Sequence, residues 1–199
     1  MNSICENTTR PNYKLIVAVS KNNGIGLNGK LPWYIKKDMI YFGKMTKNTI
    51  DNCKKNAVIM GRNTWESLPS MYSPLPDRDN FIISSTLNID SVFNDNYRIK
   101  TFPSINDVIK YCDNNISCYE TVWVIGGSTI YKQFLEEKIL SKCYITRINK
   151  DYICDAFFDQ LDEAEWSMLT QEIIKTDDNI ELSFQVFDSL YLAHTNLNN

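Results

Sequence analysis

The sequence predicts an α/β protein with a central, mostly parallel sheet, helices on both faces of the sheet and an antiparallel hairpin at the C-terminal end. Up to residue 148, short apolar runs rich in β-branched residues alternate with segments of helical periodicity, the pattern of parallel strands joined by helices. Beyond residue 150, two strand-like segments follow one another without a helix between them, which favours antiparallel pairing. No repeat or linker divides the chain, so we expect a single domain over residues 1–199 with its core at about 14–190.

Short apolar runs, typical of strands buried on both faces, predict the parallel part of the sheet. They occupy residues 14–20, 56–60, 80–85, 121–127 and 143–148, with a less apolar strand at 98–102. In the C-terminal part, segments 167–176 and 181–192 are predicted to pair near a sheet edge. Leu182, Phe184 and Val186 alternate there with polar residues, as expected of a strand with one exposed face.

Helical periodicity predicts the segments between these strands. Helices are expected over residues 34–46, 104–112 and 128–137, and a further helix is expected to begin near Asn63 or Thr64. Ser104 belongs to the residue types that cap helix N-termini, and so fixes the start of the second segment. Residues 22–29, rich in glycine and asparagine, predict a loop.

The first predicted helix carries an acid on its apolar face. At about 100° per residue, Ile35, Asp38, Met39, Phe42 and Met45 fall on one side of the helix. Burial of a carboxylate without a partner costs several kcal/mol. The sequence therefore predicts that Asp38 meets either a ligand or a backbone group.

Composition and charge exclude several classes of function. The 199 residues are 43% hydrophobic and carry a formal net charge of −3, which argues against nucleic acid as the main partner. No apolar run approaches the roughly 20 residues that span a bilayer, and residues 1–13 lack the apolar centre of a signal peptide. We therefore expect a cytoplasmic protein without a membrane partner. The six cysteines lack metal-binding spacing and His194 is the only histidine, so we expect no metal and no histidine-based nucleophile.

Glycines and hydroxyl side chains follow three of the predicted strands. These junctions are Gly61 to Thr64, Ser84 to Thr86 and Gly126 to Thr129. Ligands of open α/β sheets bind beyond the carboxyl ends of the strands, where helix N-termini attract anions. Each junction alone is typical of an ordinary turn, but together they predict a phosphorylated ligand with more than one anionic group. Neither a GxGxxG fingerprint nor a GxxxxGK[ST] loop is present.

A series of sequence blocks also follows the order found in one enzyme family. The blocks are IVAVSKNNGIGLNGKLPW, an acid five residues after Trp33, AVIMGRNTWESLP, PLPDRDNFIISS, VWVIGGSTIY, and YITRI followed by CDAFF. Together they resemble the dihydrofolate reductase family over roughly residues 14 to 190. The resemblance implies the fold of that family and NADPH-dependent reduction of 7,8-dihydrofolate to tetrahydrofolate, by hydride transfer to C6 and protonation of N5. Such a reaction supports one-carbon and thymidylate metabolism, and antifolates such as methotrexate would bind at the same site.

The resemblance assigns the folate half of the site. Asp38 would accept hydrogen bonds from the amidine-like edge of the pterin ring, Trp33 would order a water near the pterin, and Thr146 would bond the Asp38 carboxylate from behind. Arg78 would bind the α-carboxylate of the glutamate tail, and Asp77, where the family commonly has glycine, would weaken this contact by repulsion. The pocket would be lined by Ile16, Val17, Ala18, Met39, Phe42, Leu68 and Ile125.

The resemblance also assigns a binding site for NADPH. Arg62, Ser84 and Ser85 match the site of the 2′-phosphate, and Thr64 belongs to the cradle of the pyrophosphate. The full set implied is Ala18, Ile25, Gly29, Gly61, Arg62, Asn63, Thr64, Ser84, Ser85, Thr86, Gly126, Gly127, Ser128, Thr129 and Tyr131. A cis peptide would join the two glycines at 126 and 127.

The loop at 22–30 would close over the nicotinamide. Gly24, Gly26 and Gly29 are its candidate flexible points. Its expected partner is Asp155, as an acceptor of hydrogen bonds from the loop.

Two other functions stay open at this stage. One is a related pterin or pyrimidine reductase with the same fold. The other is an inactive family member that binds folate or nucleotide without turnover. We expect a monomer, unless the chain is fused to, or cut from, a thymidylate synthase chain.

Overall fold

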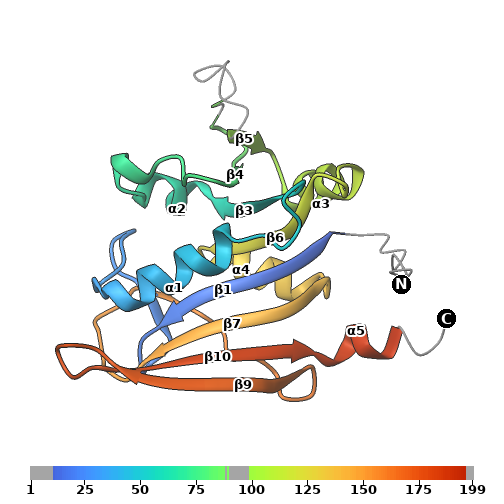
Figure 1. Cartoon of the computed structure of the whole chain (residues 1–199). Helices are drawn as coiled ribbons and strands as arrows, with labels where there is room; N and C mark the ends of the chain where they lie inside the picture. Colours follow the sequence, from blue (N-terminus) through green and yellow to red (C-terminus); the bar gives the residue numbers. More distant parts are fainter. Residues whose placement is uncertain (1–10, 88, 90–98, 196–199) are drawn as a thin grey trace.

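The computed structural model describes residues 11–87, 89 and 99–195, which form an eight-stranded sheet with flanking helices (Figure 1). The strands of this sheet are β1 (Asn12–Val19), β3 (Lys55–Gly61), β4 (Asp79–Ile83), β5 (Ile99–Phe102), β6 (Tyr119–Gly126), β7 (Leu140–Ile148), β9 (Trp166–Lys175) and β10 (Glu181–Ser189). Their order is β5-β4-β3-β6-β1-β7-β10-β9. All pairs from β5 to β7 are parallel, and β10 is antiparallel to both β7 and β9. The predicted fold class is therefore confirmed.

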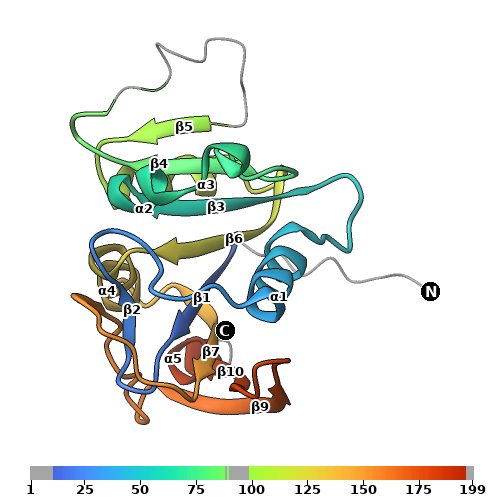
Figure 2. The ribbon, with the colours of Figure 1, turned by 90° about the vertical axis from the view of Figure 1, so that its left-hand side faces the viewer.

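Helices cover both faces of the sheet (Figure 2). On one face lies α1 (Lys36–Lys47), whose Phe42 and Met45 pack against a buried cluster that includes Ile16 of β1. On the other face lie α3 (Ile105–Asn114) and α4 (Ser128–Glu136). Because successive strand residues point to opposite faces, Val17 of β1 joins the cluster beneath α3 and α4.

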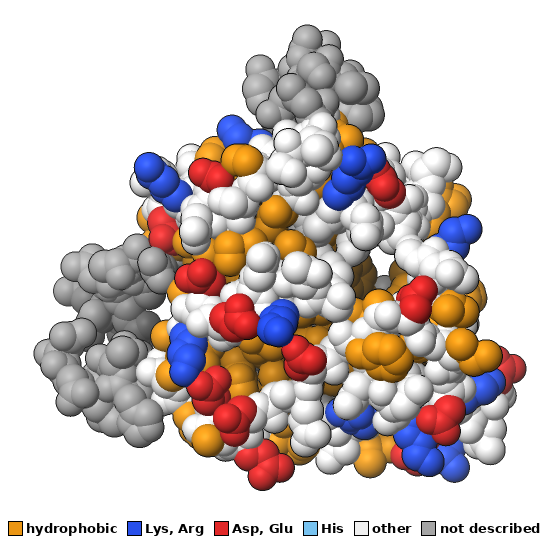
Figure 3. Space-filling model, turned by 180° about the vertical axis from the view of Figure 1, so that it is seen from behind, with side chains coloured by type: hydrophobic (Ala, Val, Ile, Leu, Met, Phe, Trp, Pro, Cys, Tyr) orange, Lys and Arg blue, Asp and Glu red, His pale blue; other side chains and the backbone are white. Residues whose placement is uncertain are grey.

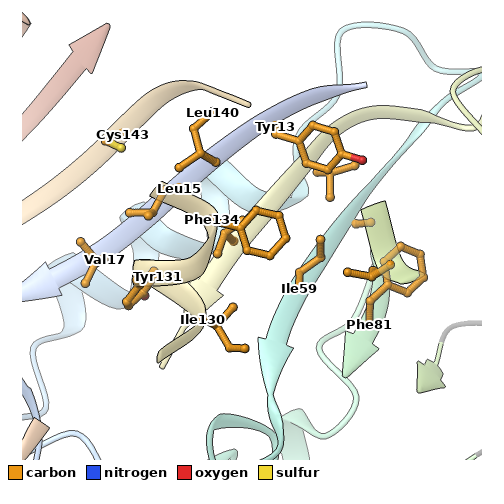
Figure 4. Close-up of a cluster of buried hydrophobic side chains, with 14 of the residues drawn as sticks. Tyr13, Leu15, Val17, Ile59, Phe81, Ile130, Tyr131, Phe134, Leu140 and Cys143 are labelled. Atoms are coloured by element: carbon orange, nitrogen blue, oxygen red, sulfur yellow. The ribbon is translucent and has the colours of Figure 1, made fainter. Parts of the chain in front are cut away.

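The larger core cluster fixes α4 against the sheet (Figure 4). Phe134 of α4 and Leu15 of β1 are fully buried in it, and Phe81 meets Tyr119 edge to face with ring centroids 5.7 Å apart. Burial of each such side chain contributes about 1.5–3 kcal/mol. The packing holds the N-terminus of α4 at the carboxyl edge of the parallel strands.

Most element boundaries shift by one to three residues from those predicted, and two of the differences change an element. The helix predicted to begin near Asn63 or Thr64, α2 (Arg62–Ser67), begins slightly earlier, directly after β3, with Gly61 as its N-terminal cap residue. The backbone stays extended through Gly61 and turns helical at the next residue, which leaves no room for a separate cap. At the other end, residues 190–192 open the helix α5 (Leu190–Thr195) instead of extending β10. Tyr191 turns away there and bonds the Leu140 carbonyl through its hydroxyl group at 2.9 Å.

The loop predicted at 22–29 contains a short strand. This strand, β2 (Gly24–Gly26), pairs antiparallel with β8 (Ala156–Phe157). Glycine has a low strand propensity and the paired segments are very short, so no local pattern predicts a strand here. By contrast, the cap at Ser104 is as predicted, since its hydroxyl group accepts from the Asp107 amide at 3.3 Å. A short 3₁₀ turn, Ser70–Tyr72, follows α2.

Acidic and basic side chains both lie on the face seen in Figure 3. The helices among the described residues are all too short or too polar for a membrane span.

Candidate active site

The predicted ligand-binding junctions meet at one edge of the sheet. Since β3 pairs in parallel with β6, the starts of α2 and α4 lie side by side at the carboxyl ends of these strands. A cis peptide joins Gly126 to Gly127, as the resemblance implied. Gly126 has a φ of +116°, and a Cβ atom built there would lie 3.0 Å from the Tyr131 ring. At Gly127 a Cβ atom would lie 3.4 Å from the Thr64 hydroxyl oxygen, so the two helix starts approach closely through glycine backbone.

Asp38 is buried on the inner side of α1, with 6% of its surface exposed. Burial raises the pKa of its carboxyl group to about 6, against the opposing effect of a hydrogen bond from the Thr146 hydroxyl group. Thr146 lies on β7 and is itself buried. Thr146 thus lies next to Asp38, and its support of the carboxylate stays a prediction.

Trp33 lies just before α1 and is 8% exposed. Its ring packs against Tyr152 with centroids 5.1 Å apart. The Nε1 atom is buried and has no hydrogen-bond partner within the described part of the chain. A buried donor of this kind is normally satisfied by water or a ligand, as the resemblance implies for Trp33.

The predicted apolar wall divides between the two faces of the sheet. Ile16 and Ile125 are buried on the α1 side, where Phe42 and Leu68 pack against the same cluster, and Ala18 packs beside Trp33. Because residues of a β-strand alternate between the two faces of the sheet, the Val17 side chain points to the face opposite α1. The prediction that this side chain lines the pocket is therefore wrong. Met39, predicted on the buried stripe of α1, is 40% exposed.

Arg78 is a buried cation beside this wall, with 3% of its surface exposed. Its Nε donates to the Pro76 carbonyl at 3.0 Å, its Nη1 donates to the Thr46 hydroxyl group, and the guanidinium lies 5.8 Å from the Phe42 ring centroid. Burial lowers the pKa of Arg78 to about 10, against the opposing charge of Asp77. These hydrogen bonds go to neutral oxygens, so the cation remains suited to an anionic ligand.

Asp77, the neighbour of Arg78 in the chain, is paired with another cation. Its side chain is 65% exposed and forms an ion pair with Lys47 at 3.0 Å. The residue has a φ of +64°, which explains why glycine suits this position. The expected repulsion is weakened because the Asp77 charge is paired and solvated.

The group predicted for the 2′-phosphate lies at the surface. The Arg62 Nη1 atom donates to the Thr86 hydroxyl group at 3.0 Å, and the Ser84 hydroxyl group accepts from the Thr86 and Leu87 amides at 3.3 and 2.9 Å. Sequence reasoning missed Glu66, whose carboxylate pairs with the Arg62 Nε at 2.6 Å. Its spacing of four residues from Arg62 on a helix was the available signal.

The remaining predicted cofactor residues lie around these helix starts and on the loop. Tyr131 of α4 is buried and donates from its hydroxyl group to the Ile16 carbonyl at 2.9 Å. Asn63, Ser85 and Thr129 are exposed, while Gly61 and Ser128 are half-buried. Beside them, a hollow of about 430 Å³ is lined by Ile83, Pro103, Ser104, Ile105, Asn106, Gln133, Glu136 and Glu137.

The loop at 22–30 contacts Asp155 as predicted. The Asn28 amide donates to the Asp155 carboxylate at 2.8 Å, and the Asp155 amide donates to the Gly26 carbonyl at 2.9 Å. Gly24 is packed against Cys154, where a Cβ atom would meet the sulfur at 2.3 Å. This close packing does not support the prediction that Gly24 is a flexible point of the loop. Gly29, at a φ of +73°, has open space around it.

This geometry agrees with a family-level comparison. The sequence matches the family model described as Dihydrofolate reductase over residues 12–189. The chain belongs to the dihydrofolate reductase family. Dihydrofolate reductases are NADPH-dependent oxidoreductases, and this chain is one of them.

Individual relatives cover most of the chain. It is 40% identical over 181 residues to the dihydrofolate reductase of Heliothis virescens, an alignment that covers 88% of this chain and 96% of the relative. Identity to the Gallus gallus dihydrofolate reductase is 34% over 186 residues, with 89% and 96% covered. A bifunctional dihydrofolate reductase-thymidylate synthase of Daucus carota is 38% identical over 162 residues, which are 78% of this chain and 30% of that protein.

Proposed function

We propose that the chain reduces 7,8-dihydrofolate at the carboxyl ends of β1 and β6, with Asp38 as the group that recognises and polarises the pterin. The observation that carries this proposal is a carboxylate that is 6% exposed and is hydrogen-bonded by Thr146. A desolvated acid with a raised pKa, next to a wall of apolar side chains, is typical of a functional site.

Asp38 acts on the pterin through charge and hydrogen bonds. Its two oxygens accept from the 2-amino group and the neighbouring ring nitrogen, a contact that offsets the cost of burying the carboxylate. The negative charge favours protonation of N5, which a water held by the Trp33 indole N–H can reach. Thr146 orients the carboxylate from behind.

The glycine-lined helix starts suit a dinucleotide phosphate. Thr64 and the backbone from Gly126 to Thr129 would hold the pyrophosphate, because Gly127 lets the backbone at the start of α4 lie close to the Thr64 hydroxyl group. Arg62, with Ser84, Ser85 and Thr86, would hold the 2′-phosphate. NADPH supplies the hydride when bound; the chain provides alignment, exclusion of water by loop 22–30 and charge placement.

Arg78 supplies the second anchor of the substrate. Its buried guanidinium would bind the α-carboxylate of the glutamate tail, and Phe42 and Leu68 would contact the benzoyl group between the two anchors. Antifolates with a charged diaminopyrimidine-like edge, such as methotrexate, would pair with Asp38 in the same way. We further propose that the protein acts in the cytoplasm as a monomer formed by one domain, without nucleic-acid or membrane partners.

The experiment is NADPH consumption by the purified protein, with dihydrofolate as substrate beside a pterin that lacks the glutamate tail and a reducible pyrimidine. We expect turnover with dihydrofolate, weaker use of the tail-less pterin and none of the pyrimidine. Faster turnover of the pyrimidine would favour a related reductase. Stabilisation by methotrexate and NADPH without turnover would favour a binding module.

A further inference from the structure

The base of the loop at 22–30 is a tightly bonded turn from Ser20 to Gly24. Ser20 is fully buried, and its hydroxyl group donates to the Asn22 side-chain oxygen at 2.5 Å and accepts from the Gly24 amide at 2.9 Å. Asn23, at the bend, has a φ of +61°. Its backbone carbonyl accepts from the Phe158 amide at 2.9 Å. The turn is thus tied to the rest of the chain at its bend.

A single cation from the sheet holds the Asn23 side chain. The Arg147 Nη1 atom donates to the Asn23 side-chain oxygen at 3.0 Å. Arg147 is half-buried and takes part in none of the ion pairs recorded among the described residues. A hydrogen bond from a charged donor is roughly twice as strong as a neutral one, and it is stronger still where water is partly excluded.

Arg147 directly follows Thr146 on β7, and the two side chains point to opposite faces of the sheet. Thr146 bonds Asp38 on the α1 face. One strand therefore carries both the support of the pterin-binding acid and the support of the loop base. The register of β7 against β1 places Thr146 opposite Ala18 and Arg147 opposite Val19, immediately before the turn.

The tip of the loop is built differently from its base. Leu27 and Lys30 exchange backbone hydrogen bonds of 2.8 and 3.0 Å around Asn28 and Gly29, both with positive φ. Asp155 provides the tie from outside through the Asn28 amide. Because its own backbone hydrogen bonds close the tip, we expect the tip to move as a unit about the base of the loop.

We propose that Arg147 is a positioning residue that fixes the base of loop 22–30 through Asn23, and so sets how often the tip lies over the nicotinamide. This inference rests on the proposed role of the loop as a cover for the active site. The hydrogen bond acts only on loop position, so it affects hydride transfer more than binding of dihydrofolate.

The experiment compares Arg147→Met, Asn23→Gly and the double variant with the wild type. Glycine keeps the left-handed backbone at residue 23 accessible while it removes the acceptor, and methionine keeps much of the apolar stem of Arg147. Lys21→Met is the matched control, since Lys21 is an exposed cation in the same turn. Amide exchange of residues 22–30 is measured in the ligand-free enzyme, and hydride transfer is measured in a single turnover at saturating substrates.

Each single variant is expected to speed amide exchange of the loop and slow hydride transfer by about three- to tenfold, with the KM for dihydrofolate changed less than twofold. The double variant should match the singles, because both remove the same hydrogen bond. Asn23→Asp alone should slow amide exchange of the loop, because a carboxylate accepts a stronger hydrogen bond from Arg147. The same substitution should have no such effect in combination with Arg147→Met. Unchanged amide exchange of the loop, or additive effects in the double variant, would contradict the proposal that Arg147 holds the base of the loop through Asn23. Faster exchange with unchanged hydride transfer would support the anchor and instead contradict the loop's role as a cover.

Discussion

Arg78 and Arg62 are the two cations assigned to anionic groups of the ligands, and the structure holds them in opposite ways. Arg78 is 3% exposed and donates to neutral oxygens, whereas the Arg62 side chain is 47% exposed and already pairs with Glu66. The folate half therefore keeps desolvated charges, Asp38 among them, while the cofactor half relies on glycine backbone and surface hydroxyl groups. A buried charge without its ligand is costly, and an exposed ion pair is worth little, so the two halves should respond very differently to substitution.

The largest effect is expected on the stability of the ligand-free protein. The pKa of Asp38 is raised from 3.8 to about 6, so the folded state holds its proton more tightly and loses stability as the pH rises through this range. Asp38→Asn should therefore raise the free energy of unfolding at pH 7 by about 2–3 kcal/mol. Urea unfolding at pH 7 and at pH 3.5 tests this, since the gain should vanish at the lower pH. A loss of stability at pH 7 would contradict the account of a costly buried acid.

The second effect concerns Arg78. Arg78→Gln should lower kcat/KM for dihydrofolate by about thirty- to a hundredfold, because a buried charged partner of the tail carboxylate is lost. Steady-state kinetics with a pterin that lacks the glutamate tail provides the control, and its kcat/KM should change little. Equal losses with both substrates would mean that Arg78 only supports the fold through Thr46 and Pro76.

Substitution of Arg62 should have a smaller consequence. Arg62→Gln is expected to raise the KM for NADPH by about five- to tenfold and to leave the KM for NADH unchanged, since only NADPH carries the 2′-phosphate. The ratio of the KM for NADPH to the KM for NADH measures this effect. The difference in this ratio between the variant and the wild type should shrink as the salt concentration rises, because salt screens the attraction of Arg62 for the phosphate. A parallel change for NADH would place Arg62 outside the 2′-phosphate site.

The smallest effect is expected from the loss of the hydrogen bond between Thr146 and Asp38. Thr146→Val removes a hydrogen bond that favours the charged carboxylate, so the pKa of Asp38 should rise further above 6. Methotrexate affinity measured against pH should then reach its plateau at a higher pH than in the wild type. An unshifted plateau would show that Thr146 does not support the carboxylate in solution.

Much of this contrast was accessible from the sequence. Apolar runs and helical periodicity predicted the parallel sheet, because buried strands and amphipathic helices leave strong patterns, and the acid on the stripe of α1 marked Asp38 before any fold was known. Val17 was placed on the wrong face because a resemblance carries residue identity but not the alternation of a strand. The pairing of β2 with β8 and the bond from Arg147 to Asn23 connect segments more than a hundred residues apart, and no local pattern encodes them. The pairing of Glu66 with Arg62 could have been predicted, since residues four apart are neighbours on a helix.

The most direct test of the central claim is the pH dependence of dihydrofolate reduction by the wild type and by Asp38→Asn. If Asp38 polarises the pterin and favours protonation of N5, the variant should lose activity strongly near neutral pH and recover as the pH falls, because protons from solution then replace the effect of the carboxylate. Wild-type activity should change around the pKa of the buried acid, near 6 in the ligand-free protein. Parallel pH profiles for the two proteins, or full activity of the variant at pH 7, would contradict the account.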